Sequence, residues 1–200
     1  MITMNKEAYN KIAGQWADAR NRLSPGKLVE DFSLKIKKQG KVLDIGCGTG
    51  CPIAKYLSDK GFFVTGIDIS ENMLKKAIDQ KIKNAQFYLC DFFEFKPDEK
   101  YDGIIAFDSF FHFPQKRQHE IYAKIADWIN RDGYLLFTHG NKEGEITGTM
   151  FGETFYYSAL DKENVHTLLL QYGFEIELSI EKYQEDTMDR DLVIIAKKIK

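Results

Sequence analysis

Three glycines separated by single residues are the clearest chemical feature of the sequence. They are Gly46, Gly48 and Gly50, in the segment V-L-D-I-G-C-G-T-G over residues 42–50. Glycine adopts positive φ angles easily and lets a ligand approach the backbone closely. A short apolar run precedes the loop, and a helix is expected to start near Pro52. Free N–H groups at the start of that helix would suit a phosphate or a carboxylate, so the pattern predicts a ligand-binding loop.

An acidic residue further along supports this interpretation. Asp68 closes the next expected strand, where a carboxylate typically accepts hydrogen bonds from ribose hydroxyls. A tight turn that binds nothing would explain the glycines alone, but it would not require Asp68. A dinucleotide fingerprint is G-x-G-x-x-G, whereas residue 51 is cysteine. The spacing therefore argues against a dinucleotide ligand.

Titratable side chains follow the fourth and fifth expected strands. The segment F-D-S-F-F-H-F-P, residues 107–114, contains His112, and His139 ends the fifth strand. Histidine titrates near neutrality, so His112 is the better candidate for a general base and His139 the weaker one. The alternative for His112 is a loop histidine that caps the following helix.

Alternating strands and helices must position these residues. Helical spacing predicts two helices within residues 5–38, separated by a break at residues 24–26. Further helices are expected over 52–57, after the N-cap Ser70, and over 119–129 and 162–172. Strands are expected over residues 42–45, 62–67, 85–89, 102–107, 134–138, 175–181 and 191–197. The alternation predicts an α/β fold with a doubly wound, Rossmann-like, mostly parallel sheet. The last two strands have no helix between them, which predicts a C-terminal antiparallel hairpin.

Length and composition limit the class of protein. The 200 residues suit a single domain over residues 1–200, with residues 1–38 as an N-terminal helical cap. The net charge of −2 provides no overall attraction for nucleic acid or an anionic membrane. No signal peptide or apolar spanning segment is visible, so we expect a cytoplasmic protein. The three cysteines fit neither a zinc site nor a disulfide framework, and we expect no metal.

The long connection over residues 141–159 is a candidate substrate loop. It is rich in glycine and aromatic residues, and long loops often act as lids or binding loops. Tyr156 and Tyr157 are the candidate substrate-binding residues within it. An insertion that packs against the sheet edge is the alternative.

Taken together, several segments closely resemble the class I S-adenosylmethionine-dependent methyltransferases. These are residues 42–50, V-T-G-I-D-I-S over 64–70, L-C-D-F over 89–92, Y-D-G-I-I-A-F over 101–107 and R-D-G-Y-L-L-F over 131–137. The resemblance covers about half the chain in the expected order. It implies S-adenosylmethionine as the cofactor and a seven-stranded sheet whose last strand is antiparallel.

The resemblance also implies a role for each matching residue. Asp44 would bind the ammonium group of the cofactor, Asp68 the ribose and Asp91 the adenine amino group. Alternatively, Asp44 forms a turn and Asp91 caps a helix. The implied cofactor-binding residues are Asp44, Gly46, Gly48, Gly50, Asp68, Ile69, Asp91, Phe92 and Phe107.

We therefore expect a methyltransferase, monomeric or homodimeric, that acts on an oxygen or nitrogen atom of a small molecule. No motif for positioning a nucleic-acid base follows the fourth strand. One alternative is an NAD(P)-dependent oxidoreductase, since Tyr56 and Lys60 match the Tyr-x-x-x-Lys pair of short-chain dehydrogenases. The other is a protein that binds S-adenosylmethionine without catalysis.

Overall fold

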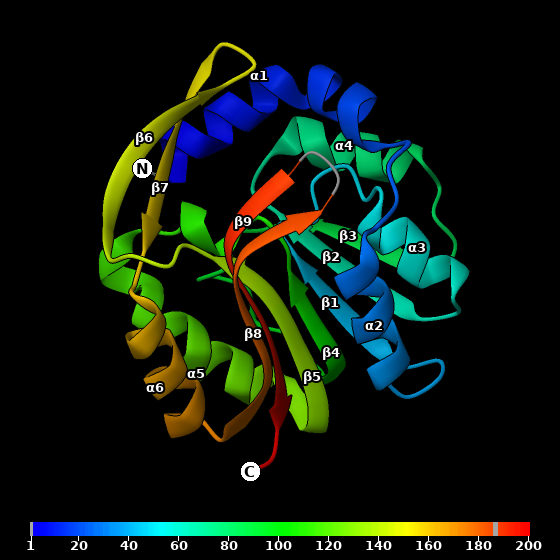
Figure 1. Cartoon of the computed structure of the whole chain (residues 1–200). Helices are drawn as coiled ribbons and strands as arrows, with labels where there is room; N and C mark the ends of the chain where they lie inside the picture. The colour runs from blue at the N-terminus through cyan, green and yellow to red at the C-terminus, as the bar shows by residue number, and fades with distance from the viewer. Residues whose placement is uncertain (1, 186–187) are drawn as a thin grey trace.

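A seven-stranded sheet runs through the centre of the molecule (Figure 1). The computed structural model describes residues 2–185 and 188–200. The strand order is β3-β2-β1-β4-β5-β9-β8. The first five strands are parallel, β9 is antiparallel to β5, and β8 is antiparallel to β9. The predicted Rossmann-like sheet with a C-terminal antiparallel hairpin is confirmed.

The described residues form strands and helices with the following bounds. The central strands are β1 Lys41–Ile45, β2 Phe63–Asp68, β3 Ala85–Leu89, β4 Tyr101–Ala106, β5 Ile129–His139, β8 Phe174–Glu185 and β9 Met188–Lys198. A separate two-stranded sheet consists of β6 Gly144–Met150 and β7 Glu153–Ala159. The α-helices are α1 Ile2–Arg20, α2 Lys27–Lys35, α3 Ile53–Asp59, α4 Glu71–Asp79, α5 Gln118–Trp128 and α6 Lys162–Gln171. Two 3-10 turns, η1 Phe110–His112 and η2 Gln115–Arg117, lie between β4 and α5.

Consecutive side chains of the central strands pack into different cores. In β1, Val42 packs on the side of α2 and α3, whereas Leu43 packs on the side of α5 and α6. The same alternation separates Leu135 from Leu136 in β5. Successive strand residues point to opposite faces of a sheet, so continuous apolar runs specify a sheet covered on both faces. Figure 1 shows α5 and α6 on one side and α2 and α3 on the other.

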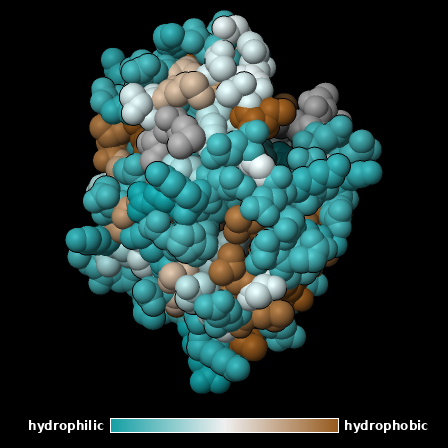
Figure 2. Space-filling view, turned by 90° about the vertical axis from the view of Figure 1, so that its left-hand side faces the viewer, coloured by the Kyte–Doolittle hydropathy of each residue, from teal (hydrophilic) through white to brown (hydrophobic). Residues whose placement is uncertain are grey.

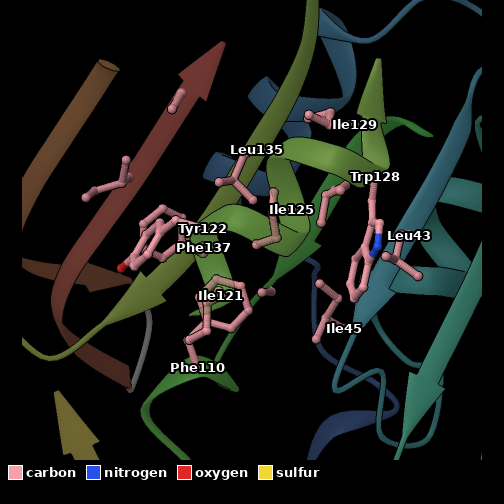
Figure 3. Close-up of a cluster of buried hydrophobic side chains, with 14 of the residues drawn as sticks. Leu43, Ile45, Phe110, Ile121, Tyr122, Ile125, Trp128, Ile129, Leu135 and Phe137 are labelled. Atoms are coloured by element: carbon pink, nitrogen blue, oxygen red, sulfur yellow. The ribbon is translucent and has the colours of Figure 1, made fainter. Parts of the chain in front are cut away.

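Aromatic and branched side chains fill the core beneath α5. Figure 3 shows Ile121, Ile125 and Trp128 of this helix facing Leu43 and Ile45 of β1. Within this core, the Tyr122 side chain is fully buried and its hydroxyl has no hydrogen-bond partner among the described residues. Such packing fixes the central strands, and therefore the loops at their carboxyl ends.

A smaller third core joins α1 to the β6–β7 hairpin. It includes Ile12 of α1, Met73 of α4 and Phe155 of β7. Figure 1 shows the hairpin reaching from the sheet to α1 across the end of the molecule. The expectation that residues 141–159 form a long loop is therefore wrong. Backbone pairing from Gly144 to Ala159 makes this segment a hairpin.

Other differences from the predicted elements are small. Residues 131–133, which separate the expected helix over 119–129 from the expected strand over 134–138, lie inside β5, where the pairing with β4 changes register between Tyr101 and Gly103. The predicted N-cap Ser70 accepts a hydrogen bond from the Met73 N–H, as expected for a helix start. Among the described residues, no helix combines the length and the apolar character required to cross a bilayer.

Candidate active site

The carboxyl ends of β1, β2 and β4 border a narrow cleft, here called the inner cleft. The N–H groups of Gly46 and Cys47 donate to the Ile67 carbonyl at 2.8 and 3.1 Å, which fixes the glycine loop beside β2. Gly46 has φ 74°, and a Cβ there would lie 2.6 Å from the Cβ of Ser109. Only glycine fits this close approach. Gly46 and Gly48 line the cleft.

Gly50 lies outside the inner cleft in a packing position. It has φ 75°, and a Cβ at this residue would lie 3.0 Å from atoms of Ile82 and Phe87. It is absent from the wall of the cleft, unlike the other two glycines. Its predicted contribution to cofactor binding is therefore limited to shaping the loop.

Asp68 is a partly buried carboxylate held by backbone donors. Its Oδ2 accepts from the Gly48 N–H at 2.9 Å and its Oδ1 accepts from the Ser70 N–H at 2.8 Å. Burial raises the pKa of this carboxyl, and the backbone N–H groups oppose that effect. Each oxygen retains a further lone pair, so the side chain can accept from hydroxyl groups of a ligand in the cleft.

Asp44 lines the same cleft and is 3% exposed. Burial, followed by repulsion from Asp68, raises the pKa of Asp44 to about 7. No cation contributes to this shift, so the site has a buried carboxylate that a cationic ligand would stabilise. This fits the ammonium group of S-adenosylmethionine.

The opposite end of the cleft is lined by Ile69, Asp91 and Phe92. The Oδ1 atom of Asp91 accepts from the Phe93 N–H at 2.8 Å, so Asp91 does cap the following turn. Its position on the cleft wall leaves Oδ2 as a candidate acceptor for a ligand. The capping role and the binding role are therefore compatible. Phe92 is 3% exposed and stacks on Phe113, with ring centroids 4.9 Å apart.

Phe107 and Asp108 directly follow β4 and line the inner cleft. Asp108 has φ 61°, and its two carboxylate oxygens accept from Arg190 Nε and Nη2 at 2.9 and 3.0 Å. Arg20 of α1 lies 3.6 Å from the same carboxylate. The Arg190 guanidinium also covers the Phe107 ring at 4.3 Å. The sequence does not indicate this cluster, because its members come from α1, the end of β4 and β9.

A second cavity, here called the outer cavity, adjoins the inner cleft and has a volume of about 810 Å³. Its lining comes from α1, η1, the end of β5, the β6–β7 hairpin and β9. Tyr9, Trp16, Asp108 and His112 line both the outer cavity and the inner cleft. Tyr9 and Trp16 pack on the third core and also form part of this shared wall.

His112 is partly buried, and both of its ring nitrogens have protein partners. Nε2 lies 2.8 Å from the Tyr9 hydroxyl, and Nδ1 lies 3.0 Å from the Tyr156 carbonyl and 3.1 Å from Asn5 Nδ2. Burial lowers the pKa of His112 to about 4. The expectation of a near-neutral pKa is therefore wrong, because desolvation disfavours the imidazolium.

His139 also lies against protein oxygens. Its Nδ1 is 2.7 Å from the Gly140 carbonyl and its Nε2 is 3.0 Å from Gln118 Oε1. His139 lines the outer cavity. A ligand could bind either ring nitrogen only if the contact with Gly140 or with Gln118 were broken. The geometry favours His112, joined to Tyr9, over His139.

The two candidate substrate tyrosines point in different directions. Tyr157 lines the outer cavity. The Tyr156 hydroxyl instead donates to Glu145 Oε1 at 2.6 Å, and this residue lines neither cavity. Adjacent residues of β7 alternate between faces, so both side chains cannot reach the same ligand. The prediction that the Tyr156 side chain binds the substrate is therefore wrong, because this side chain points away from the outer cavity.

The pair that suggested an oxidoreductase lies away from both cavities. Tyr56 is on α3 and Lys60 directly follows this helix, and the Tyr56 hydroxyl lies 3.3 Å from the Ser33 hydroxyl of α2. Neither residue lines the inner cleft or the outer cavity. Their spacing therefore has a structural explanation, which is the packing of α3 against α2.

The fold and the inner cleft define the class I S-adenosylmethionine-dependent methyltransferases, and comparisons with known proteins agree. The model of the family described as "Methyltransferase domain" matches residues 13–178. The chain belongs to this family, whose cofactor is S-adenosylmethionine. The predicted superfamily is thus confirmed.

Individual relatives show how far the similarity extends. A relative from Geobacillus sp. (strain WCH70), named as a methyltransferase, is 33% identical over 136 residues, which cover 61% of this chain and 53% of the relative. A methyltransferase structure from Methanosarcina mazei is 21% identical with a TM-score of 0.72, covering 88% of this chain and 99% of that one. The Burkholderia thailandensis 1,6-didemethyltoxoflavin-N1-methyltransferase is 19% identical with a TM-score of 0.71, and the match covers 100% of this chain and 87% of that one. The chain spans about half the length of the first curated relatives it matches.

Proposed function

We propose that this protein transfers the methyl group of S-adenosylmethionine to an oxygen or nitrogen atom of a small molecule, by direct in-line transfer. The observation that carries the proposal is the wall shared by the inner cleft and the outer cavity. Tyr9, Trp16, Asp108 and His112 border both spaces. A donor in the cleft and an acceptor in the cavity would therefore meet at these residues, and positioning of this kind supplies much of the acceleration of a bimolecular reaction.

The chain's own residues would hold the donor at both of its ends. S-adenosylmethionine supplies a methyl group that is activated by a sulfonium centre. In this proposal, Asp44 pairs with the ammonium group and Asp68 accepts from the ribose hydroxyls. Ile69 packs on the adenine, and Asp91 accepts from its amino group. The buried Asp44 carboxylate, the backbone donors that hold Asp68 and the close glycine backbone support these assignments.

The proton of the acceptor would leave through Tyr9 to His112. The Tyr9 oxygen accepts the acceptor's proton while the Tyr9 proton moves to His112 Nε2, 2.8 Å away. Nδ1–H remains on the Tyr156 carbonyl, so the imidazolium keeps a hydrogen bond. An acceptor hydroxyl becomes strongly acidic as its oxygen is alkylated. A base with a pKa of about 4 is therefore adequate for this step.

The nature of one structural relative supports a small-molecule acceptor. The Burkholderia thailandensis enzyme has 1,6-didemethyltoxoflavin and S-adenosylhomocysteine bound together in its structure. In this chain, an outer cavity of about 810 Å³ lies beside the inner cleft and falls within the usual range for small-molecule sites.

An acceptor screen tests the proposal. The protein is incubated with S-adenosylmethionine and a panel of phenols, amines and carboxylic acids, and the release of S-adenosylhomocysteine is measured. We expect release with at least one class, and its loss in Asp68→Ala at a subsaturating donor concentration. Binding of S-adenosylhomocysteine without release across the whole panel would favour a non-catalytic binding protein.

A further inference from the structure

We propose that the outer cavity takes a flat aromatic or heteroaromatic acceptor that is uncharged or cationic rather than anionic. This inference rests on the proposed function, because it assigns the outer cavity to the methyl acceptor. It adds the chemical class of that acceptor.

Aromatic side chains from three separate segments line the cavity. Tyr9 and Trp16 come from α1, Phe111 and His112 from η1, and Tyr157 from β7. All five are partly exposed, whereas the neighbouring Phe155 is fully buried in the third core. Aromatic rings with a packing role alone would be fully buried, as the Phe155 ring is. These five rings instead present surface to the cavity.

The rings form two linked groups. The centroid of the Tyr157 ring lies 4.9 Å from that of His112 and 5.7 Å from that of Phe111, and the interplanar angles are 39° and 41°. Tyr9 meets Trp16 edge to face at 5.8 Å, and it meets His112 edge to face at 5.4 Å. A flat ligand can therefore make offset-stacked or edge-to-face contacts with either group, which are the preferred geometries of aromatic pairs.

This aromatic surface reaches the point where the two cavities meet. Tyr9, Trp16 and His112 belong to the wall shared with the inner cleft, whereas Phe111 and Tyr157 line the outer cavity alone. A ring held between these residues would present a substituent toward the cleft. The Tyr9 hydroxyl lies at this junction, so the reacting hydroxyl or amino group of the ligand would be placed beside it.

The charges around the cavity indicate the preferred charge of the ligand. Among the described residues that line it, carboxylates outnumber lysine and arginine side chains five to three. The carboxylates are those of Asp108, Glu143, Glu145, Asp189 and Asp191, and the cations are those of Lys142, Lys182 and Arg190. Arg190 is already bonded to both oxygens of Asp108. The remaining excess of negative charge opposes an anionic ligand.

Figure 2 shows the face of the molecule at the left of Figure 1, which is largely hydrophilic with separate hydrophobic residues. Scattered exposed apolar side chains are ordinary on a protein surface. The outer cavity differs because its aromatic side chains line one continuous cavity.

Binding of naphthalene probes to the protein saturated with S-adenosylhomocysteine tests the inference. The probes are 2-naphthol, 2-naphthylmethylamine, 2-naphthoate and the saturated analogue decahydro-2-naphthol, measured by calorimetry at low ionic strength. We expect 2-naphthol to bind about three- to tenfold more tightly than its saturated analogue, because ring contacts are lost. We expect 2-naphthoate to bind about two- to fivefold more weakly than 2-naphthol, and added salt to reduce this difference.

Matched variants locate the probe. Tyr157→Leu removes a ring from the cavity while retaining apolar volume, and should weaken 2-naphthol binding about three- to tenfold. Phe111→Leu is a second variant of the same design. The control is Tyr88→Leu, on the edge strand β3, where the side chain is 46% exposed and lines neither cavity. It should leave binding unchanged.

The outcomes separate this inference from the proposed function. Three results would overturn the aromatic acceptor site: equal affinity for 2-naphthol and decahydro-2-naphthol, preferential binding of 2-naphthoate, or no binding of 2-naphthol to the protein saturated with S-adenosylhomocysteine. Normal binding of S-adenosylhomocysteine in those experiments would leave the proposed function standing. A protein that binds the probes but not S-adenosylhomocysteine would instead contradict the proposed function.

Discussion

The hydroxyl of Tyr9 lies 2.8 Å from Nε2 of His112, and this contact joins α1 to the 3-10 turn after β4. In the tautomer that carries Nδ1–H, this group donates to the Tyr156 carbonyl at 3.0 Å, and Nε2 accepts from the Tyr9 hydroxyl. Nε2 then carries the lone pair of a neutral imidazole. His112 would therefore reach a ligand through Tyr9.

Removing either member of this pair should lower turnover with little effect on cofactor affinity. We expect His112→Ala and Tyr9→Phe each to reduce kcat about 10²-fold, the usual contribution of a positioned acid or base. The double variant should lose little more than either single variant, since the two groups act as a unit. The measurements are kcat with the best acceptor from the screen and calorimetric titration with S-adenosylhomocysteine. An unaltered rate in His112→Ala would leave this residue with a structural role only.

Cofactor affinity should depend on pH through Asp44. The pKa of this carboxyl is raised to about 7, so the free protein holds a proton there below pH 7. Binding of an ammonium group requires the carboxylate, and the proton must leave first. Affinity for S-adenosylhomocysteine should therefore be constant above about pH 8 and fall by up to about tenfold per unit below pH 7.

The matched variant for this test is Asp44→Asn. It should bind S-adenosylhomocysteine more weakly at pH 8 and should lose the pH dependence between pH 6 and 8. The titrations are performed by calorimetry in buffers of equal ionic strength. The same pH dependence in the wild-type protein and in Asp44→Asn would assign it to another group.

Asp68→Ala should weaken cofactor binding by about 1–3 kcal/mol, because charge-assisted hydrogen bonds are lost. The substitution also removes acceptors for the N–H groups of Gly48 and Ser70. Asp68→Asn retains an acceptor oxygen and the volume of the side chain, and should therefore lie between Asp68→Ala and the wild-type protein. Both affinities are measured with S-adenosylhomocysteine, and an unchanged affinity in Asp68→Ala would remove this residue from the site.

Tyr122→Phe should raise the free energy of unfolding by about 1 kcal/mol, since a buried polar group without a partner is costly. The Tyr122 side chain is fully buried, and its hydroxyl has no hydrogen-bond partner in the described part of the chain. Urea denaturation of the two proteins measures the difference. A loss of stability in the phenylalanine variant would show that the hydroxyl has a stabilising partner.

The donor half of the site was the more predictable half from sequence. Its residues lie at strand ends within continuous motifs, so local pattern and spacing place Asp44, Gly46 and Asp68 in one cleft. β3 was predicted with its observed bounds for the same reason, because a short apolar run is delimited by polar neighbours. Gly50 is the exception, and its packing against Ile82 and Phe87 depends on tertiary contacts.

The acceptor half depends on contacts between distant segments. The bond between Asp108 and Arg190 and the contact between Tyr9 and His112 join residues far apart in the chain. No local pattern specifies such pairs. The pKa of His112 is likewise a consequence of burial, which the sequence does not show. Tyr156 was assigned to the substrate because residues 141–159 were treated as a loop, whereas strand alternation directs its side chain away.

The central claim is that the inner cleft holds the donor and the outer cavity holds the acceptor, on either side of a shared wall. A crystal structure of the protein with S-adenosylhomocysteine and 2-naphthol tests this claim most directly. We predict S-adenosylhomocysteine in the inner cleft with its ribose hydroxyls on Asp68, and the naphthol ring in the outer cavity with its hydroxyl beside Tyr9. S-adenosylhomocysteine bound away from Asp68, or naphthol bound away from the wall formed by Tyr9 and His112, would contradict this account.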